Sequence, residues 1–259
     1  MNREDKKQAA LGYVFLLPSL VMFAVFMFYP LFYTLYLSFF EWNMVKPVKK
    51  FVGLGNYISV LKDPNTWKIF GNTFWYIVIL LVFNFVMPYI LSFILSCVIK
   101  KGQSFYKAVF FLPYMLGTLI ISYVFKYIFA NLIPVLGKAL GIAALSNNVL
   151  GTGNAWIGVL VVTIWQSMAF NTLIYLSGLQ TVDRDLYEAA ALDGATGFRR
   201  FFQITFPLIA PFFTINMVLS GKNYLMAFDQ FIAMTNGGPG TATTAISVLI
   251  YKKGFSGGQ

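Results

Sequence analysis

The side chains that most often perform catalysis are nearly absent from this sequence. Its 259 residues include no histidine and a single cysteine. Without histidine, neither a Ser-His-Asp nor a Cys-His catalytic arrangement can form, and zinc sites with histidine ligands are excluded. One cysteine cannot close an internal disulfide or supply a four-thiolate metal cluster. The sequence also shows no paired carboxylates within reach of each other, so we expect no catalytic residue, no metal site and no enzyme activity in this chain.

A phosphate-binding loop is missing as well. The pattern Gly-x-x-x-x-Gly-Lys-Ser/Thr cradles phosphates with backbone N–H groups and a lysine. The glycine-rich stretch Asn236–Thr241 has no lysine and no strand–helix context, and Ser220–Asn223 matches the pattern only by accident. We therefore expect no cofactor in this chain.

The polar segment with the clearest internal pattern is Asp185–Pro207, which separates two apolar runs. Asp183 or Asp185 can cap a short helix, and three consecutive alanines give that helix high propensity and small side chains. Gly194 can adopt the left-handed conformation that ends a helix, and Pro207 suits the first turn of the next one. The pattern predicts two short helices joined at a glycine, with a surface that another protein could approach closely. An ordered loop between two membrane spans is the alternative.

The amino-acid composition indicates the environment of the elements that position these segments. Apolar residues make up 58% of the chain and charged residues 11%, with 28 Phe, 15 Tyr and 5 Trp. A soluble domain is usually about a quarter charged. The sequence therefore indicates a protein embedded in lipid.

Five apolar runs each reach the roughly 20 residues needed to cross the hydrocarbon core of a bilayer. They are Leu11–Phe40, Thr73–Ile99, Ala108–Ala130, Trp156–Leu179, and Ile204 to about Phe228. We interpret Asn131–Ala155 as a loop with an interfacial helix, and expect kinks at Pro18 and Pro30. The prediction is an all-α, polytopic membrane protein with five complete transmembrane helices in a single transmembrane domain, residues 1–259.

The net charge of +10 comes from 19 basic and 9 acidic residues. The basic residues lie in short groups between the apolar runs and do not cluster on one face, so we expect membrane lipid headgroups, and no nucleic acid, as their partner. Basic residues fall in nearly equal numbers on the two sides of the predicted spans, so their distribution does not decide the orientation.

The segment between the fourth and fifth runs resembles a known family motif. Glu188-Ala-Ala, followed by Gly194 and then Ile204-x-x-Pro207, resembles the cytoplasmic EAA loop of binding-protein-dependent ABC importer permeases. That family has leucine before the proline where this chain has Phe206, which keeps the apolar character. In the family, the loop docks into a groove on the ATPase subunit. The resemblance implies an ATPase-coupling loop at residues 181–207, with Glu188, Ala189, Ala190, Asp193, Gly194, Ile204 and Pro207 as its coupling residues.

Further motifs resemble the carbohydrate branch of the family, the maltose and glycerol-phosphate type. They are Phe51-Val-Gly-Leu-Gly-Asn56-Tyr57, Leu112-Pro113-Tyr114, Phe228-Asp229, Thr235-Asn-Gly-Gly-Pro-Gly240 and Thr243-Thr244. The resemblance extends from Leu11 to Phe255. The family has one more membrane helix after this point, so we expect the last family helix to be missing from this sequence.

The resemblance implies the transmembrane permease subunit of an ATP-driven sugar importer, with the fold of a type I ABC importer permease. Sugar or oligosaccharide would move inward by alternating access. The implied partners are a dimer of ATP-binding ABC subunits, a second homologous permease subunit and an extracytoplasmic sugar-binding protein. Because the coupling loop faces the cytoplasm in the family, we expect a multi-pass protein of the bacterial plasma (inner) membrane with a cytoplasmic N-terminus.

Polar side chains within the apolar runs are the candidate sugar contacts, because polar groups in lipid are costly and usually face a cavity or another helix. These candidates are Tyr114, Thr118, Trp165, Gln166, Asn171, Ser220, Asn223 and Tyr224, and the resemblance to maltose-type permeases adds Phe170. Tyr114 with Thr118, and Ser220 with Tyr224, are spaced i, i+4, so we expect each pair to share one helix face. Hydrogen bonding between helices is the alternative role for each residue.

Lys222 is a further pathway candidate because it falls inside the fifth run. A buried ammonium needs a partner, and Asp229 lies two helical turns further on. The alternative partner is an anionic substrate, such as an acidic sugar or a phosphorylated polyol.

Two other classes of transporter are weighed against the sugar importer. A secondary transporter would need intramembrane carboxylates for proton or sodium coupling, and no predicted span carries a central Asp or Glu. An ABC permease for amino acids or peptides would share the coupling loop, and the Phe51–Tyr57 motif is what favours sugars.

Overall fold

The computed structural model describes residues 3–42, 48–99 and 101–256, with the backbone alone for residues 3–10, 97, 98 and 256. It divides into two compact units, Met1–Trp67 with Gly258–Gln259, and Lys68–Gly257. Met1, whose cytoplasmic location the sequence predicts, lies outside the described residues.

The first unit begins with a long apolar helical path. Helix α1 (Arg3–Phe23) continues through a π-helical turn, η1 (Ala24–Phe28), into α2 (Tyr29–Leu37). Pro30 lies in the first turn of α2, directly after the π-helical turn, where a proline costs the helix little. Every side chain from residue 11 to residue 36 is exposed in this chain, as expected where apolar side chains face lipid or another subunit.

The Phe51–Tyr57 motif packs against the end of α2. Strand β1 (Phe40–Glu41) pairs antiparallel with β2 (Lys50–Phe51), a short ribbon that the sequence did not predict, and α3 (Gly55–Lys62) follows. The Asn56 amide donates to the backbone oxygens of Ser38 and Phe40, at 2.9 and 3.0 Å. The motif therefore fixes the turn that follows the first membrane helix.

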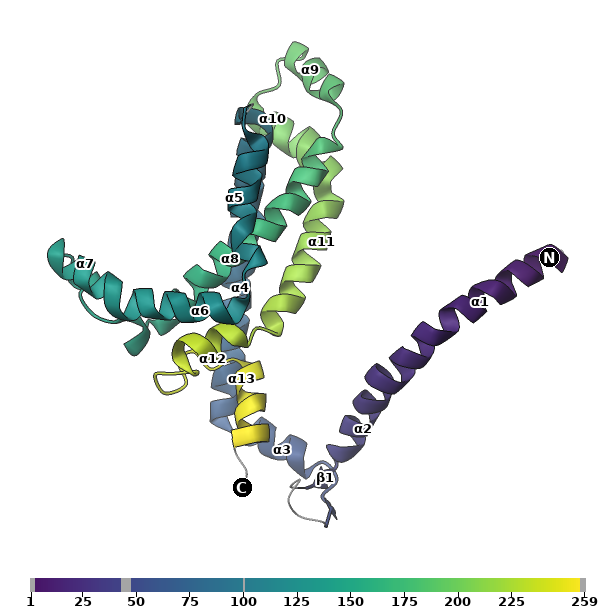
Figure 1. The fold of residues 1–259 in the computed structure, drawn as a ribbon, viewed down its shortest axis with the longest axis vertical. Coiled ribbons are helices and arrows are strands. Elements are labelled where there is room, and N and C mark those ends of the chain that lie inside the picture. The colour runs from purple at the N-terminus through teal and green to yellow at the C-terminus, as the bar shows by residue number, and fades with distance from the viewer. Residues whose placement is uncertain (1–2, 43–47, 100, 257–259) are drawn as a thin grey trace. The chain divides into compact units, whose positions relative to one another are not determined.

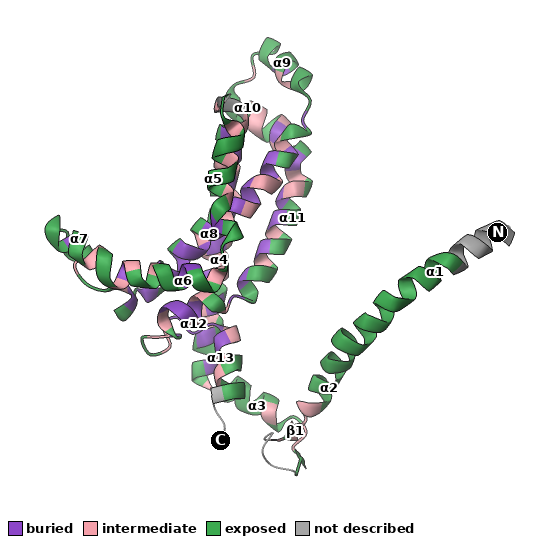
Figure 2. Cartoon of the chain, in the orientation of Figure 1, coloured by how far each residue is buried: buried purple, intermediate pink, exposed green. Residues whose placement is uncertain are grey.

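The second unit is built around α8 (Ala155–Gln180), the most buried of its long helices. Half of the apolar window of α8 is buried, against 22% for Pro64–Ser96 and for Gly197–Leu225. Helices α5 (Gln103–Met115), α6 (Thr118–Tyr127), α11 (Phe206–Leu225) and α12 (Asp229–Thr235) pack against it. Figure 1 shows α4, α5, α8 and α11 side by side, and Figure 2 shows the buried residues concentrated on their facing sides.

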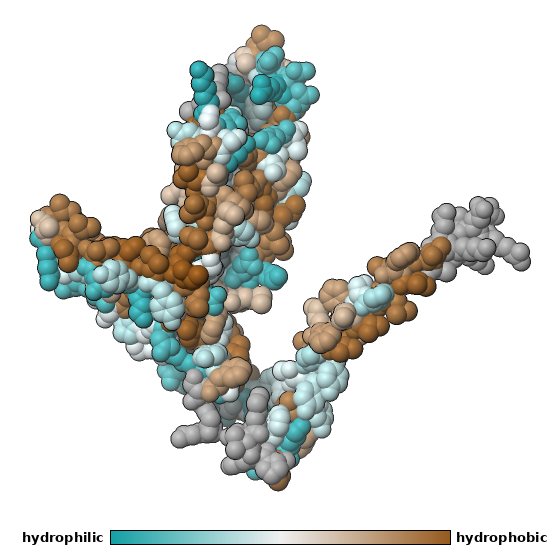
Figure 3. Space-filling model, in the orientation of Figure 1, coloured by the Kyte–Doolittle hydropathy of each residue, from teal (hydrophilic) through white to brown (hydrophobic). Residues whose placement is uncertain are grey.

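Two apolar clusters hold this bundle together. One contains Leu80, Val159 and Phe231, and the other contains Tyr175 and Ile209. The outer faces of the same helices remain apolar, and Figure 3 shows hydrophobic surface along the bundle with hydrophilic residues gathered near α9 (Arg184–Leu192) at one end. This distribution is that of a helix bundle surrounded by lipid.

The prediction of five membrane helices is confirmed. Five helices are long and apolar enough to cross a membrane: Leu11–Leu37, Pro64–Ser96, Thr118–Ala139, Ala155–Gln180 and Gly197–Leu225. The second begins earlier than expected, with α4 (Pro64–Phe93), because the Asp63 carboxylate accepts from the backbone N–H of Asn65 and the Thr66 hydroxyl, at 3.0 Å each. The π-helical turn η2 (Ile94–Val98) ends it.

The third predicted span is wrong in one respect. The sequence predicted a single helix over Ala108–Ala130, but α5 ends at Met115 and α6 begins at Thr118, with Leu116 and Gly117 extended between them. Beyond α6, the helical path continues through η3 (Ile128–Leu132) and α7 (Ile133–Ala139), and Figure 1 shows this path running sideways from the bundle. Only the short turns η4 (Ala143–Leu145) and η5 (Val149–Gly151) follow before α8.

Helix α9 ends as the sequence predicted. The Asp183 side chain accepts from the backbone N–H of Asp185 at its start. At its end Gly194 is left-handed (φ +70°), and the N–H groups of Ala195 and Gly194 donate to the carbonyls of Ala190 and Ala191, the hydrogen-bond pair of a Schellman motif.

The second predicted helix of this segment runs directly into the fifth span. Helix α10 (Gly197–Arg200), the π-helical turn η6 (Phe201–Thr205) and α11 form one continuous helix. The sequence predicted that Pro207 begins the membrane helix, but this helix already begins at Gly197. Pro207 follows directly after η6, where the irregular hydrogen bonding reduces the cost of its missing N–H.

The end of the described chain folds back on the start of α4. After α12, the loop 236–245 leads to α13 (Ile246–Tyr251) and η7 (Lys252–Ser256). The amide of Asn72 donates to the carbonyl of Thr241, and the Thr73 hydroxyl accepts from the backbone N–H of Ile246. The glycine-rich loop is thereby tied to the second membrane helix.

Candidate functional site

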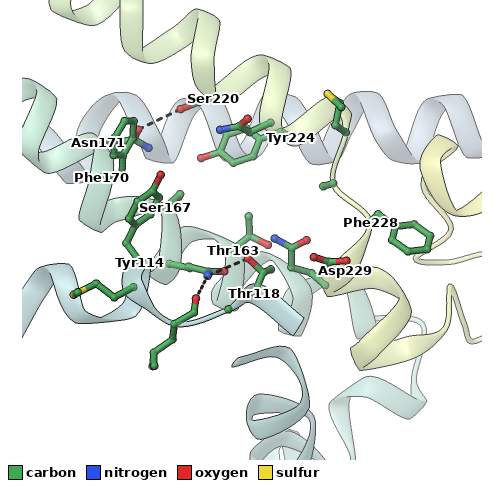
Figure 4. A pocket seen from close by; sticks show the side chains of 18 residues that line it. Tyr114, Thr118, Thr163, Ser167, Phe170, Asn171, Ser220, Tyr224, Phe228 and Asp229 are labelled. Carbon is green, nitrogen blue, oxygen red and sulfur yellow. Dashed lines mark hydrogen bonds between the residues drawn. The ribbon is translucent and has the colours of Figure 1, made fainter. Parts of the chain in front are cut away.

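A cavity of about 650 Å³ lies where α5, α6, α8, α11 and α12 meet. Figure 4 shows the side chains of its 18 lining residues. They are Tyr114, Met115, Leu116, Gly117, Thr118, Thr163, Gln166, Ser167, Phe170, Asn171, Ser220, Asn223, Tyr224, Met226, Ala227, Phe228, Asp229 and Gln230. Most ligand sites are concave and have a volume of this order, with a few polar groups among apolar ones.

The broken helix forms one wall of this cavity. Gln166 on α8 donates through Nε2 to the carbonyl oxygen of Leu116 at 3.2 Å and to the Thr118 hydroxyl at 3.1 Å. The amide thus compensates for a backbone carbonyl that the α5–α6 break leaves without a helical partner. Interrupted membrane helices are tolerated where their polar backbone lines a cavity, and they recur at the substrate sites of transporters.

An aromatic pair forms a second wall. The rings of Tyr114 on α5 and Phe170 on α8 are stacked, with centroids 5.0 Å apart and planes 17° from parallel. Tyr114 remains 47% exposed, so part of its ring surface is open. The pair provides a flat apolar surface beside the hydrogen-bonding groups of the cavity.

A buried polar network supports the cavity from the side of α4. The Asn84 amide donates to the Ser220 hydroxyl at 2.7 Å and accepts from the Asn171 amide. Asn216 donates to the backbone carbonyl of Asn171 at 3.2 Å. All four residues are buried, and only Asn171 and Ser220 also line the cavity. The network links three helices, so these two side chains also make the interhelical hydrogen bonds that were the alternative role for each of them.

Tyr224 differs from the hydrogen-bonded residues of this network. Its side chain is 5% exposed and lines the cavity, yet its hydroxyl makes no hydrogen bond within the described part of the chain. The hydroxyls of Ser167 and Ser220 lie nearby. A buried hydroxyl without a partner is costly, so a bound polar molecule would be favoured here.

The cavity includes eight of the ten pathway residues that the sequence singled out. They are Tyr114, Thr118, Gln166, Phe170, Asn171, Ser220, Asn223 and Tyr224. The reason given for pairing Tyr114 with Thr118 is wrong, because the two lie on different helices and the break brings both to the cavity. Ser220 and Tyr224 lie on one helix, α11, and both are buried.

The other two pathway candidates lie outside the cavity lining. Trp165 on α8 packs against Phe125, with ring centroids 5.2 Å apart. Lys222 on α11 is exposed. The ion pair expected between Lys222 and Asp229 does not form among the described residues, because Asp229 begins a new helix, α12, and does not continue the face of α11.

Several lining residues were not anticipated from the sequence. Thr163 and Ser167 lie on α8 at helical spacing from Gln166 and Phe170, and that periodicity could have identified them. Asp229 and Gln230 enter through the turn between α11 and α12, and no local pattern predicts that turn.

The coupling segment is mostly exposed. Helix α9 projects from one end of the bundle in Figure 1, with Ala190 buried and Glu188 and Ala189 exposed. Leu192 is 90% exposed. Ile204 is half-buried, and the Tyr187 hydroxyl bonds to that of Thr205 at 2.9 Å, which ties α9 to η6. The segment is thus anchored at one side and open at the other.

Comparison with known proteins identifies the family. The family model "Binding-protein-dependent transport system inner membrane component" matches residues 91–253, which include both the cavity and the coupling segment. The chain belongs to this family. It is accordingly a multi-pass membrane protein and a permease component of binding-protein-dependent transport, and five of its helices are long and apolar enough to cross a membrane.

Three relatives are similar to this chain over nearly its whole length. The multiple sugar-binding transport system permease protein MsmF of Streptococcus mutans is 35% identical, over 96% of this chain and 86% of the relative. The trehalose/maltose transport system permease protein MalF of Thermococcus litoralis is 34% identical, over 95% and 83%. The sn-glycerol-3-phosphate transport system permease protein UgpA of Brucella abortus is 32% identical, over 95% and 84%.

The fold is also found in a solved structure. A bacterial ABC transporter involved in the import of the acidic polysaccharide alginate superposes with a TM-score of 0.79 at 24% identity. The match covers 99% of this chain and 88% of that chain. At this identity it establishes a shared fold and leaves the substrate to be argued from the cavity itself.

Proposed function

We propose that this chain is the permease subunit of an ATP-driven importer that carries a sugar or oligosaccharide through the cavity at the α5–α6 break. The cavity carries the proposal, because it combines what a sugar requires. Tyr114 and Phe170 offer a flat aromatic surface, and Gln166, Asn223 and Tyr224 offer amide and hydroxyl groups. The names of relatives such as the trehalose/maltose and multiple-sugar permeases agree with this substrate class.

Energy would enter through α9. Its exposed face, with Glu188, Ala189 and Leu192, suits docking into a groove of a separate ATPase, which would hold ATP and Mg²⁺. The Tyr187–Thr205 bond and the continuous helix from Gly197 to Leu225 would pass the movement of α9 to α11, which lines the cavity. Closure of an ATPase dimer would in this way switch the cavity between the two sides of the membrane.

The remaining partners follow from the same proposal. A second, homologous permease subunit would cover the exposed faces of this chain, and an extracytoplasmic binding protein would deliver the sugar. A bacterial alginate ABC transporter with this fold has been solved in complex with an alginate pentasaccharide-bound periplasmic protein. The coupling segment would face the cytoplasm, and the N-terminus would lie on the same side of the bacterial inner membrane.

The test is ATP-dependent sugar uptake by the assembled importer in proteoliposomes, with a panel of labelled neutral disaccharides. Tyr114→Ala removes the exposed ring of the aromatic wall, and we expect the KM for the transported sugar to rise about tenfold with little change in ATPase activity. Tyr106→Ala on the same helix, outside the cavity, is the matched control.

Either of two results would contradict the proposal. Uptake that proceeds equally well without ATP would indicate a secondary transporter. A Tyr114→Ala importer with the KM of the control would show that the sugar does not use this cavity.

A further inference from the structure

Lys222 is a cation on a mostly apolar face of a membrane helix. Its side chain is exposed on α11, and it makes no hydrogen bond or ion pair with any residue that the structure describes. Val218, Leu219 and Leu225, all within four residues of it, are exposed as well. A charge in such surroundings needs contact with water or a partner of opposite charge.

A hydrogen bond between helices shows how deep in the bilayer Lys222 lies. The Asn84 amide donates to the Ser220 hydroxyl at 2.7 Å, so these residues of α4 and α11 share one depth. Along the sequence, the charged residues nearest to Asn84 are Lys68 and Lys100, sixteen residues before it and sixteen after it. At the rise of a helix each is about 24 Å away, which puts Asn84 near the middle of a hydrocarbon core about 30 Å thick. Lys222 is two residues from Ser220 and lies close to the same depth.

Neither lipid headgroups nor the contents of the cavity neutralise the Lys222 ammonium. The surface of the hydrocarbon core is about 15 Å from its centre, and the four-carbon stem of a lysine is much shorter than that distance. Lys222 is also not among the 18 residues that line the cavity. The counter-ion therefore has to approach from outside the bundle.

The membrane helices of this chain supply no carboxylate for the pair. The five helices that are long and apolar enough to cross the membrane contain no Asp or Glu. Asp229, the nearest acidic residue along the sequence, lines the cavity, and it forms no ion pair with Lys222 in the described structure. A carboxylate at this depth must come from the membrane helix of a different chain.

We propose that Lys222 forms an ion pair with an Asp or Glu in a membrane helix of the second permease subunit, and that the exposed face of α11 around it is part of the interface between the two subunits. The inference rests on the proposed function, which includes that second subunit. Because no span of this chain carries an acidic residue, the second subunit differs from it in having one.

The interface proposed here borders the cavity. Met226, one turn beyond Lys222, is 65% exposed and lines the cavity, and so does Asn223, the next residue after Lys222. A helix that is held at Lys222 by an ion pair also covers this rim of the cavity. The pair thus ties the packing of the two subunits to the enclosure of the transported molecule.

The experiment measures assembly. The chain is tagged and produced together with the other subunits of the importer, and the amount of second permease subunit that co-purifies in mild detergent is quantified by mass spectrometry. Lys222→Met should lower this amount at least tenfold, because it leaves the partner carboxylate buried without a counter-ion. Lys222→Arg keeps the charge and should retain assembly.

Lys126→Met is the matched control, and membrane levels of the tagged chain are measured for every variant. Lys126 is also an exposed lysine within a span, but its ammonium lies over the ring of Tyr123, 5.8 Å from the centroid, so it has a partner in its own chain. It should assemble normally.

The second subunit supplies the reciprocal test. Each Asp or Glu in its membrane spans is replaced singly by Asn or Gln, and we expect one replacement to reduce assembly as Lys222→Met does. Combining that replacement with Lys222→Met removes both charges and should restore most of the assembly, which identifies the pair.

The outcomes separate this inference from the proposed function. If the wild-type chain co-purifies with its second subunit and Lys222→Met does so equally well, or if that subunit has no acidic residue in a span, the ion pair is wrong and the sugar importer stands. Normal assembly with loss of uptake would assign Lys222 to the transported molecule and overturn the pair. If no second permease subunit co-purifies with the wild-type chain, the proposed function fails and this inference fails with it.

Discussion

Two of the helices that are followed by a left-handed glycine, α12 and α9, differ in what surrounds that glycine. Gly237 (φ +80°) follows the left-handed C-cap of α12, Asn236 (φ +50°), and Gly194 (φ +70°) follows α9. A side chain at Gly237 would meet the Thr244 hydroxyl at 2.8 Å, whereas one at Gly194 would meet nothing within 4 Å. The same local conformation is thus enclosed in one place and open in the other.

The hydrogen bonds show the same difference. In the loop after α12, the hydroxyls of Thr235 and Thr243 bond to each other at 2.6 Å, and Thr243 and Thr244 donate to the carbonyls of Gly238 and Gly237. Lys252 donates to the carbonyl of Asn236 at 2.7 Å. The end of α9 has the two backbone bonds of its cap and leaves its outer face exposed.

This contrast separates a structural motif from an interaction motif. A segment whose polar groups are bonded within the chain contributes to stability, so substitutions in it should reduce the amount of folded protein. A segment whose side chains are exposed in this chain contributes by binding a partner, so substitutions in it should change transport while the fold remains. The following substitutions test the distinction, beginning with the largest expected effect.

Gly237→Val should remove nearly all folded permease from the membrane. The left-handed backbone costs a non-glycine residue roughly 1–2 kcal/mol, and the clash with Thr244 adds overpacking of about 1–3 kcal/mol. Quantitative immunoblotting of membranes measures the effect. Gly240→Val is the control, because Gly240 is also left-handed (φ +58°) but has no atom within 4 Å of an added Cβ. Equal losses in both variants would show that backbone strain, and not the closed loop, determines stability.

Gly194→Asp should abolish most sugar uptake while the protein remains in the membrane at its normal level. The open surroundings leave backbone strain as the cost, which is about 1–2 kcal/mol for most side chains and less for aspartate, and this strain displaces the end of α9 without unfolding the bundle. Uptake and membrane level are measured in the same cells. Gly197→Asp introduces the same charge at the start of α10, where an acidic residue is tolerated. Normal uptake in Gly194→Asp would contradict the coupling role of this segment.

Leu192→Asp should reduce transport by about tenfold with no loss of thermal stability. The side chain is 90% exposed, so the fold does not depend on it, and the minority of docking-surface residues that dominate binding each contribute more than about 1 kcal/mol of binding free energy. The measurement is sugar-stimulated ATPase activity of the assembled importer, alongside thermal unfolding in detergent. A lower melting temperature with unchanged ATPase coupling would assign Leu192 to the fold and contradict the comparison.

Thr243→Val should have the smallest effect, a loss of about 1–2 kcal/mol in the free energy of unfolding. The substitution keeps the shape of the side chain and removes the hydroxyl that bonds to Thr235 and Gly238. Thermal unfolding of the purified importer measures it. Thr214→Val on the exposed face of α11 removes a hydroxyl bonded only within its own helix, and should be close to neutral. Full stability in Thr243→Val would mean that these hydroxyls do not hold the loop.

The sequence predicted best those features that depend on neighbours along the chain. The apolar runs gave five membrane helices because hydrophobic length alone decides whether a helix can cross a bilayer. The end of α9 at Gly194 was predictable because a helix cap is formed by residues within one turn of it. Most of the candidate cavity residues were identified in the same way, as polar side chains that lipid would not tolerate.

Only the tertiary structure decided how these parts meet. The break at Leu116–Gly117 depends on Gln166, fifty residues later, whose amide replaces the lost helical bond. The exposure of Lys222 and the entry of Asp229 into the cavity depend on the turn between α11 and α12, so the charge of the cavity could not be read from the run in which Lys222 lies. Local spacing determines which residues share a helix, whereas long-range hydrogen bonds and helix packing determine which of them face the same space.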